Sequence, residues 1–230
     1  MKAAMKRIIN IDIKNIQNSD LNEQGIYIKF NEEDMMKAVA LIIGPKDSLY
    51  EHGFLIFDIQ FPNNYPFSPP KFTYKSLNKV RIHPNIYVNG KVCLSILGTW
   101  AGPSWTSAMD IVNVLITIQS LLDSNPLTNE PCYENVLDSP KGKKVNANYN
   151  EIIQYNTYNS LLYKNIKYRN DTLFKNEIEE YYSKYKQAII SNIEKHTHNV
   201  RKTHNCIYGI NEIIDYTLLY NNFKDLCIEL

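Results

Sequence analysis

The sequence lacks several features that mark common functional classes. None of its four cysteines belongs to a Cys-x-x-Cys pair or a cluster with histidine, so we expect no metal site and no disulfide framework. There is no glycine-rich phosphate loop, and we expect no bound cofactor. No apolar run reaches membrane-spanning length, and the start Met1-Lys2-Ala3-Ala4 does not open a signal peptide. These absences predict no membrane partner and a reducing location, cytoplasmic or nuclear.

The chain also has no large excess of charge of one sign. The 230 residues carry a formal net charge of +1, and charged residues make up 21% of the chain, so we expect no nucleic-acid partner. The short cluster Lys141, Lys143, Lys144 is expected to be a solvated loop. A hydrophobic content of 44% supports a real core. The length allows one large domain or one domain with an appendage.

One stretch, His83-Pro84-Asn85-Ile86-Tyr87-Val88-Asn89-Gly90-Lys91-Val92-Cys93-Leu94, carries most of the chemical information. A lone cysteine in an apolar run is usually a buried core thiol. Here, however, an amide and a turn glycine stand close to Cys93 in the sequence. A thiolate is a strong nucleophile, and an acyl group on sulfur stays reactive toward an amine. That attack builds an oxyanion, which the uncharged N–H donors of Asn85 can stabilise.

This stretch resembles the active-site signature of ubiquitin-conjugating enzymes. In that family the cysteine carries ubiquitin as a thioester, and the asparagine amide lies over the reacting carbonyl. The resemblance therefore implies that Cys93 and Asn85 are catalytic, and we interpret His83 as a hydrogen-bonding group that shapes the loop. It also implies a ubiquitin-like protein, an activating enzyme, a ubiquitin ligase and protein substrates as partners. ATP is then consumed by the activating enzyme.

Two further stretches extend the resemblance. The segment Phe61-Pro62-Asn63-Asn64-Tyr65-Pro66-Phe67-Ser68-Pro69-Pro70 is similar to the family's proline-rich loop, and Tyr50-Glu51-His52-Gly53 resembles its Tyr-Glu-Gly-Gly turn. We expect the histidine in that turn to be harmless if position 52 does not need a positive φ. The residues from Gly98 to Trp105 resemble an insertion in a subclass of large members that includes the one designated by the letter Z.

The fold class expected from the periodicity and the resemblance is α+β, the UBC fold of this family. An N-terminal helix is predicted from Met5 to Ile16. Four strands should form an antiparallel meander sheet. A central buried helix should begin at the capping box Ser107-Ala108-Met109-Asp110 and stop at Asn125-Pro126. The predicted strands are Gly25–Phe30, Lys37–Ile43, Phe54–Gln60 and Lys71–Tyr74.

The C-terminal part should add helices to this core. The sequence is helical in pattern from Tyr149 to about Lys195, with a break at Asn170-Asp171, and a last helix is predicted from Ile210 to Leu226. We therefore divide the chain into a conjugating core of residues 3–150 and a helical extension of residues 151–230. Apolar and tyrosine residues at helical spacing predict that this extension packs on the core; among them are Ile178, Tyr181, Tyr182 and Tyr185.

Two surfaces follow from the resemblance. The loop from Asn125 to Pro131 should return toward the cysteine, and in many members it carries an acid that orients the incoming lysine. Asn129 and Glu130 are both candidates for that position. The N-terminal helix should dock the activating enzyme, and its available cations are Lys2, Lys6, Arg7 and Lys14.

Two other functions compete with this one. An inactive ubiquitin-binding scaffold on the same fold would lack the cysteine, so the presence of Cys93 weighs against it. A thiol hydrolase could pair Cys93 with His83, but no third, orienting group stands at a recognisable spacing.

Overall fold

The computed structural model describes residues 2–198, 200–202 and 206–226. At its centre lies an antiparallel sheet in the order β1-β2-β3-β4. The predicted meander is confirmed. Three of its strands have the predicted bounds, because their alternating or continuously apolar residues are buried in the hydrophobic core. The strands are β1 (Ile26–Phe30), β2 (Lys37–Ile43), β3 (Phe54–Gln60) and β4 (Lys71–Tyr74).

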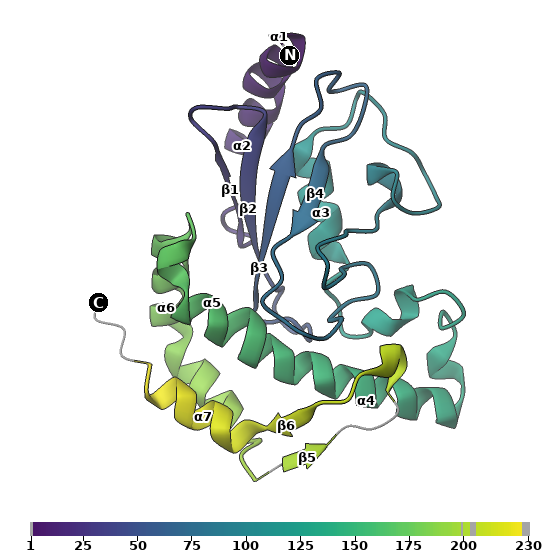
Figure 1. Ribbon diagram of the computed structural model, residues 1–230, viewed down its shortest axis with the longest axis vertical. Coiled ribbons are helices and arrows are strands. Elements are labelled where there is room, and N and C mark those ends of the chain that lie inside the picture. Colours follow the sequence, from purple (N-terminus) through teal and green to yellow (C-terminus); the bar gives the residue numbers. More distant parts are fainter. Residues whose placement is uncertain (1, 199, 203–205, 227–230) are drawn as a thin grey trace.

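A continuous helical segment precedes the sheet and lies at one end of it (Figure 1). It consists of α1 (Lys2–Arg7), a π-helical segment (Ile8–Asp12) and α2 (Ile13–Gln17). The predicted helix is confirmed and extends three residues further at its start. Ala4 and Ile8 are buried, whereas the cations Lys2, Lys6 and Lys14 are exposed.

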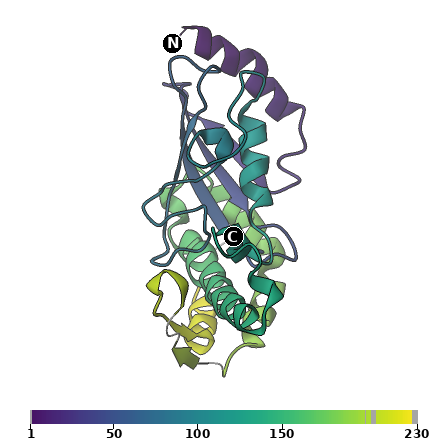
Figure 2. The same ribbon diagram turned by 90° about the vertical axis from the view of Figure 1, so that its right-hand side faces the viewer.

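The predicted central helix is α3 (Ile111–Ser120), which covers one face of the sheet (Figure 2) and ends before the predicted stop at Asn125-Pro126. Its apolar positions Ile111, Val114, Leu115 and Ile118 are all buried. The predicted capping box at Ser107 is wrong. The helix is capped instead by Asp110, whose carboxylate accepts from the backbone N–H of Asn113 at 3.1 Å while the Asn113 side chain accepts from the Asp110 N–H. The capping box that forms, between Asp110 and Asn113, therefore starts the helix three residues after Ser107.

The C-terminal helices form a layer across the opposite end of the sheet (Figure 1). One long helical segment joins α4 (Pro140–Asn156), a π-helical segment (Thr157–Tyr163) and α5 (Lys164–Lys167). It begins earlier than predicted because the Ser139 hydroxyl accepts from the Gly142 N–H and proline occupies the first helical position. The lysine cluster 141–144 consequently lies on this helix and not in the loop we expected. A 3-10 turn (Arg169–Asp171) makes the predicted break before α6 (Lys175–Glu194).

The last predicted helix is partly wrong. The helix α7 (Tyr216–Lys224) begins six residues later than Ile210, where the Asp215 carboxylate accepts from the Leu218 N–H. The preceding residues form a 3-10 turn (Ile207–Gly209) and the strand β6 (Ile213–Asp215), which pairs antiparallel with β5 (Val200–Lys202). Strands of three residues are too short for their alternation to be recognised, so the sequence pattern missed this pair.

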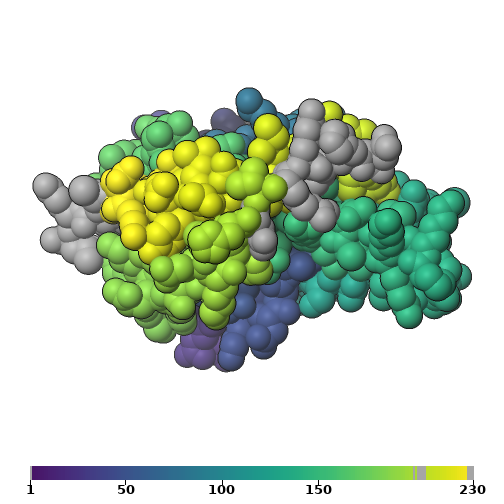
Figure 3. Space-filling view, turned by 90° about the horizontal axis from the view of Figure 1, so that it is seen from below, coloured from purple at the N-terminus to yellow at the C-terminus, as the bar shows by residue number. Residues whose placement is uncertain are grey.

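The extension packs on the core through polar and aromatic contacts. The Lys29 ammonium of β1 lies 2.6 Å from the Glu177 carboxylate of α6. The Asn165 amide donates to the backbone carbonyl of Phe54 at 3.0 Å. Seen from below, residues after about 140 make up most of the surface, with α6 and α7 side by side (Figure 3). The division at residue 150 remains a prediction, and the structure places it inside α4.

His52 is one of the contacts between core and extension. Its φ is +69°, so this position does use the left-handed conformation that the family's glycine suits, and the condition for a harmless replacement fails. The histidine ring is buried, with ring centroids 5.9 Å from Tyr181 and 5.5 Å from Tyr185 of α6. We conclude that these contacts offset the backbone strain, because a glycine would make none of them.

Within the described ranges, no helix is long and apolar enough to cross a membrane.

Candidate active site

Asn85 and Cys93 face each other across a short loop. The Cys93 N–H donates to the Asn85 carbonyl at 2.8 Å, and the Asn85 side-chain amide donates back to the Cys93 carbonyl at 2.8 Å. Asn85 is 6% exposed and Cys93 is 1% exposed. The two residues that the sequence singled out are thus brought together, and both side chains are buried.

The turn between them depends on glycine for two reasons. Gly90 has a φ of +90°, a conformation that L side chains rarely adopt. A Cβ at this position would also lie 2.9 Å from the Thr73 Cγ2 atom and 3.0 Å from the Tyr74 carbonyl oxygen. The Gly90 carbonyl accepts from the Tyr74 N–H at 2.8 Å, which ties the turn to β4.

His83 is fully buried, and both of its ring nitrogens have partners. Nδ1 accepts from the Asn85 N–H at 2.9 Å, and Nε2 donates to the Leu121 carbonyl at 2.9 Å. Burial lowers the pKa of His83 to about 3, so the ring is neutral at physiological pH. The predicted structural role is confirmed, and the Cys–His hydrolase loses its base because no free nitrogen faces the thiol.

A residue that sequence reasoning missed holds the chain on both sides of the cysteine. The Thr99 hydroxyl accepts from the Leu94 N–H at 2.9 Å and donates to the Val92 carbonyl at 2.7 Å. Thr99 thereby bridges the two neighbours of Cys93. The insertion from Gly98 to Trp105 contained this signal, since it places a hydroxyl six residues after the nucleophile.

The loop that carries the two acid candidates contains a 3-10 turn (Pro126–Asn129). The Asn129 amide donates to the Pro126 carbonyl at 3.2 Å, within its own turn. The Glu130 carboxylate accepts from the Tyr208 hydroxyl at 2.5 Å and lies 3.5 Å from the Arg81 guanidinium. The structure therefore places a carboxylate in this loop but engages it with two partners.

Arg81 was also missed by sequence reasoning. It donates from Nη2 to the carbonyl of Pro84, the residue before Asn85. Its guanidinium lies 3.8 Å from the ring centroid of Tyr87 and 4.3 Å from that of Tyr208. The Arg81 carbonyl accepts from the Tyr149 hydroxyl at 2.9 Å. No sequence pattern near the cysteine identifies this residue, because two of its contacts come from α4 and the C-terminal turn.

No group of three or more histidine, cysteine, aspartate or glutamate side chains in the described part of the chain could hold a metal ion. Cys93, Cys132 and Cys206 are free thiols, and Cys227 lies outside the described residues. The predicted absence of a cofactor remains a prediction.

Comparison with known proteins gives one family. A model of the ubiquitin-conjugating enzyme family matches residues 9–156. The human ubiquitin-conjugating enzyme E2 Z is 47% identical over 135 residues, which are 58% of this chain and 37% of that protein. A probable ubiquitin-conjugating enzyme of Caenorhabditis elegans, protein 17, is 36% identical over 181 residues, or 76% of this chain and 25% of that protein. The chain therefore spans well under half the length of these relatives.

A solved structure agrees with the fold. The E2 domain of a Toxoplasma gondii ubiquitin conjugating enzyme superposes with a TM-score of 0.51 at 26% identity. The match covers 67% of this chain and 99% of that domain. Residues outside the match belong to this chain's additions to the common fold.

Proposed function

This chain belongs to the ubiquitin-conjugating enzyme family, and on that premise we propose that it accepts ubiquitin, or a ubiquitin-like protein, as a thioester on Cys93 and transfers it to a substrate lysine. The observation that carries the proposal is the reciprocal pairing of Asn85 with Cys93. An activating enzyme supplies the modifier, and a ubiquitin ligase holds enzyme and substrate together. The free thiols suit a cytoplasmic or nuclear location.

The chemistry needs two acyl transfers. The Cys93 thiolate attacks the thioester carbonyl of the modifier on the activating enzyme, a new carbon–sulfur bond forms, and the other enzyme's thiolate leaves. A neutral lysine amine then attacks the Cys93 thioester, a carbon–nitrogen bond forms, the Cys93 thiolate leaves, and the amine loses a proton. ATP is consumed by the activating enzyme before the first step.

Asn85 has a defined part in the second transfer. Its amide nitrogen has two N–H donors, and one is directed at the Cys93 carbonyl. Either the second N–H or a small rotation of the amide presents a donor to the oxyanion that develops on the modifier's carbonyl. The Asn85 backbone is held by His83 and by Cys93 itself, so its amide lies beside the cysteine before the substrate arrives.

Charging with activating enzyme, ubiquitin and ATP tests the proposal. The wild-type chain should form an adduct that a thiol reductant removes. Cys93→Ala should form none, and Cys93→Ser should give a reductant-resistant ester, because an oxygen ester resists thiols. Cys132→Ala is the matched control, since Cys132 is an exposed free thiol, and it should charge like the wild type. A reducible adduct on Cys93→Ala would move the acceptor elsewhere and reject the assignment.

Asn85→Ala separates the two transfers. It should charge, but discharge to free lysine should be slower by a factor on the order of 10². A thermal melt of the same variant tells loss of the donor from collapse of the loop. Normal discharge would mean that Asn85 only orders the loop.

A further inference from the structure

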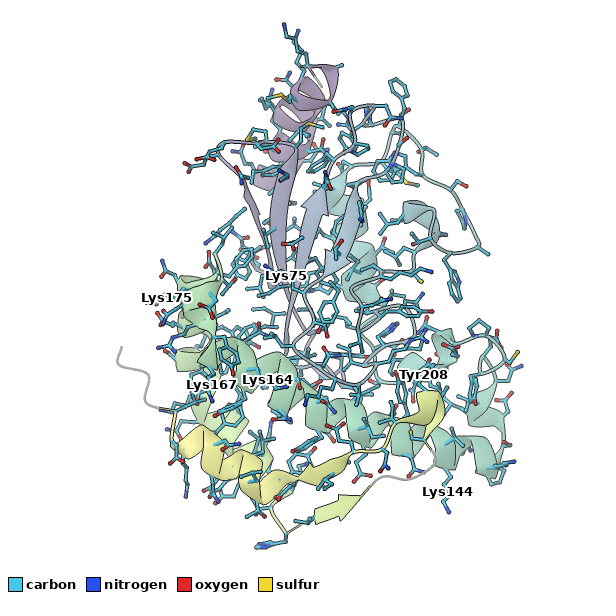
Figure 4. All side chains as sticks on the ribbon, in the orientation of Figure 1. Lys75, Lys144, Lys164, Lys167, Lys175 and Tyr208 are labelled. Carbon is cyan, nitrogen blue, oxygen red and sulfur yellow. The ribbon has the colours of Figure 1, made fainter. Side chains whose placement is uncertain are left out.

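The C-terminal turn reaches the active-site loops through one side chain. Figure 4 shows Tyr208 at the bend of the C-terminal segment, turned toward the core, whereas Lys144 on α4 points away from it. The Tyr208 hydroxyl donates to Glu130 in the loop after α3, and its ring lies against the Arg81 guanidinium. Its ring also meets that of Tyr149 edge-on, with centroids 5.8 Å apart.

The two contacts reach different loops of the core. Arg81 is stacked between Tyr87 and Tyr208 and donates to the Pro84 carbonyl, so it holds the backbone that carries Asn85. Glu130 belongs to the loop that follows α3. A single tyrosine of the extension therefore contacts two loops that are far apart in the sequence: through Arg81 the loop that carries Asn85, and directly the loop that carries Glu130.

The backbone at Tyr208 is unusual. Its φ is +61° and its ψ is +16°, the left-handed region, where a non-glycine residue is held only when its surroundings determine it. The next residue, Gly209, also has a positive φ and could take such a conformation without cost. The turn thus places strain on the residue whose side chain enters the cluster. Burial raises the pKa of Tyr208, so its hydroxyl stays protonated and remains a donor.

We propose that Tyr208 is a positioning residue for transfer to lysine: its ring holds Arg81, and through it Asn85, while its hydroxyl holds the Glu130 loop. This inference rests on the proposed function. It assigns the C-terminal turn a part in the rate of the reaction, beyond adding stability to the fold. Misplacement of a reacting group by about 1 Å is enough to cost a large factor in rate.

Single-turnover discharge of the preformed Cys93 thioester to free lysine tests it. Tyr208→Ala loses both contacts, and its maximal discharge rate should fall roughly tenfold, with charging and the apparent KM for lysine within about twofold of wild type. Tyr208→Phe keeps the ring over Arg81 and loses only the hydrogen bond, so it should fall about threefold. The matched control is Tyr220→Phe, which removes a tyrosine–glutamate hydrogen bond to Glu194 inside the extension and should discharge like wild type.

The hydrogen bond itself is tested by combination. Tyr208→Phe and Glu130→Ala remove the two ends of one bond, so the double variant should discharge no more slowly than Glu130→Ala alone. If the rate reductions of the two single variants multiply in the double variant, the two residues act independently. That result would reject the part of the proposal that concerns the Tyr208 hydroxyl. A Tyr208→Ala variant that melts earlier but discharges within twofold of wild type has only a structural role. Faster discharge would mean that the contact is inhibitory, and this too overturns the proposal.

Hydrogen exchange without any modifier keeps this inference separate from the proposed function. In the uncharged chain, Tyr208→Ala should increase exchange in residues 84–90 and 126–131 by about tenfold or more, and Tyr220→Phe should not. If the wild-type chain forms no thioester, the proposed function fails. If Tyr208→Ala leaves hydrogen exchange in these two segments unchanged, the positioning role fails, whatever the result of charging.

Discussion

Each end of the chain is fastened to the core by a tyrosine hydroxyl that donates to a carboxylate beside an arginine. At the N-terminal helix, Tyr65 donates to Asp12 at 2.5 Å, and Arg7 lies 3.8 Å from the same carboxylate. At the C-terminal turn, Tyr208 donates to Glu130 at 2.5 Å. The two arrangements differ in depth, because the Asp12 side chain is 0% exposed and the Glu130 side chain is 22% exposed.

The degree of burial of the carboxylate determines how much each cluster contributes to stability. Asp12 has lost its water and also accepts from the Ile111 N–H at 3.0 Å, so it caps the central helix as well. Opening that cluster would leave a buried charge without partners, which is strongly destabilising. Glu130 keeps contact with solvent, so its loop can be displaced at smaller cost. We infer that the N-terminal cluster maintains the fold, whereas the C-terminal cluster adjusts the site.

The largest expected effect is on stability at the N-terminal cluster. Asp12→Ala removes the acceptor of Tyr65, of Ile111 and of Arg7 at once, and it should lower the free energy of unfolding by about 3–5 kcal/mol. Glu130→Ala should lower it by about 1 kcal/mol, since its cluster is partly solvated. Urea denaturation measures both, and equal losses would break the comparison.

Removing the two hydroxyls should separate stability from rate. Tyr65→Phe takes one donor from a buried carboxylate and should cost about 1.5–3 kcal/mol of unfolding free energy, with discharge to lysine unchanged. Tyr208→Phe should show the opposite pattern, with slower discharge and a stability loss of about 1 kcal/mol or less. The pair of measurements contradicts our view if both variants change the same quantity.

Acid should reveal the buried carboxylate. Burial raises the pKa of Asp12 above its ordinary value of 3.8, so the folded state binds this proton more readily than the unfolded state. The contribution of Asp12 to stability therefore falls as pH rises from about 3.8 through the raised pKa, by at most about 1.4 kcal/mol per pH unit. The variant Asp12→Asn has no titrating group at this position. The stability difference between wild type and variant should fall as pH rises above about 3.8, and a flat difference would contradict the raised pKa.

The smallest expected effect concerns exposed charge on the N-terminal helix. Of the four predicted docking cations, Arg7 is engaged in the fold, because it donates to the Met109 carbonyl at 3.0 Å and lies beside Asp12. Lys6 and Lys14 are exposed and can meet an acidic partner. Reversing both to glutamate should slow charging by roughly three- to tenfold at low salt, with the difference shrinking as salt is raised. Thermal stability should be unchanged, and an effect independent of salt would exclude simple charge complementarity.

Predictions from the sequence succeeded where a few neighbouring residues carry the signal. The strands and the N-terminal helix follow from alternation and helical period, and the Asn85–Cys93 loop follows from its resemblance to the family's signature. Predictions failed where several local patterns compete. Ser107 and Asp110 both stand before an apolar helix, and in the folded chain Asp110 is the cap, paired with Asn113. The segment before Tyr216 has a helical pattern, yet pairing with β5 makes part of it a strand.

By itself the sequence indicated candidates for the chemistry, because the thiol of Cys93 and the amide of Asn85 can be recognised from residue type and spacing. It also determined the core elements, because burial of alternating apolar residues is a local demand. Only the tertiary structure decided how these atoms are held. Tyr208 and Glu130 are 78 positions apart and Tyr65 and Asp12 are 53 apart, so no local pattern connects them. A hydrogen bond between such residues forms only after the helices and the sheet have packed, since packing brings the donor and acceptor within reach and excludes the water that would otherwise satisfy them.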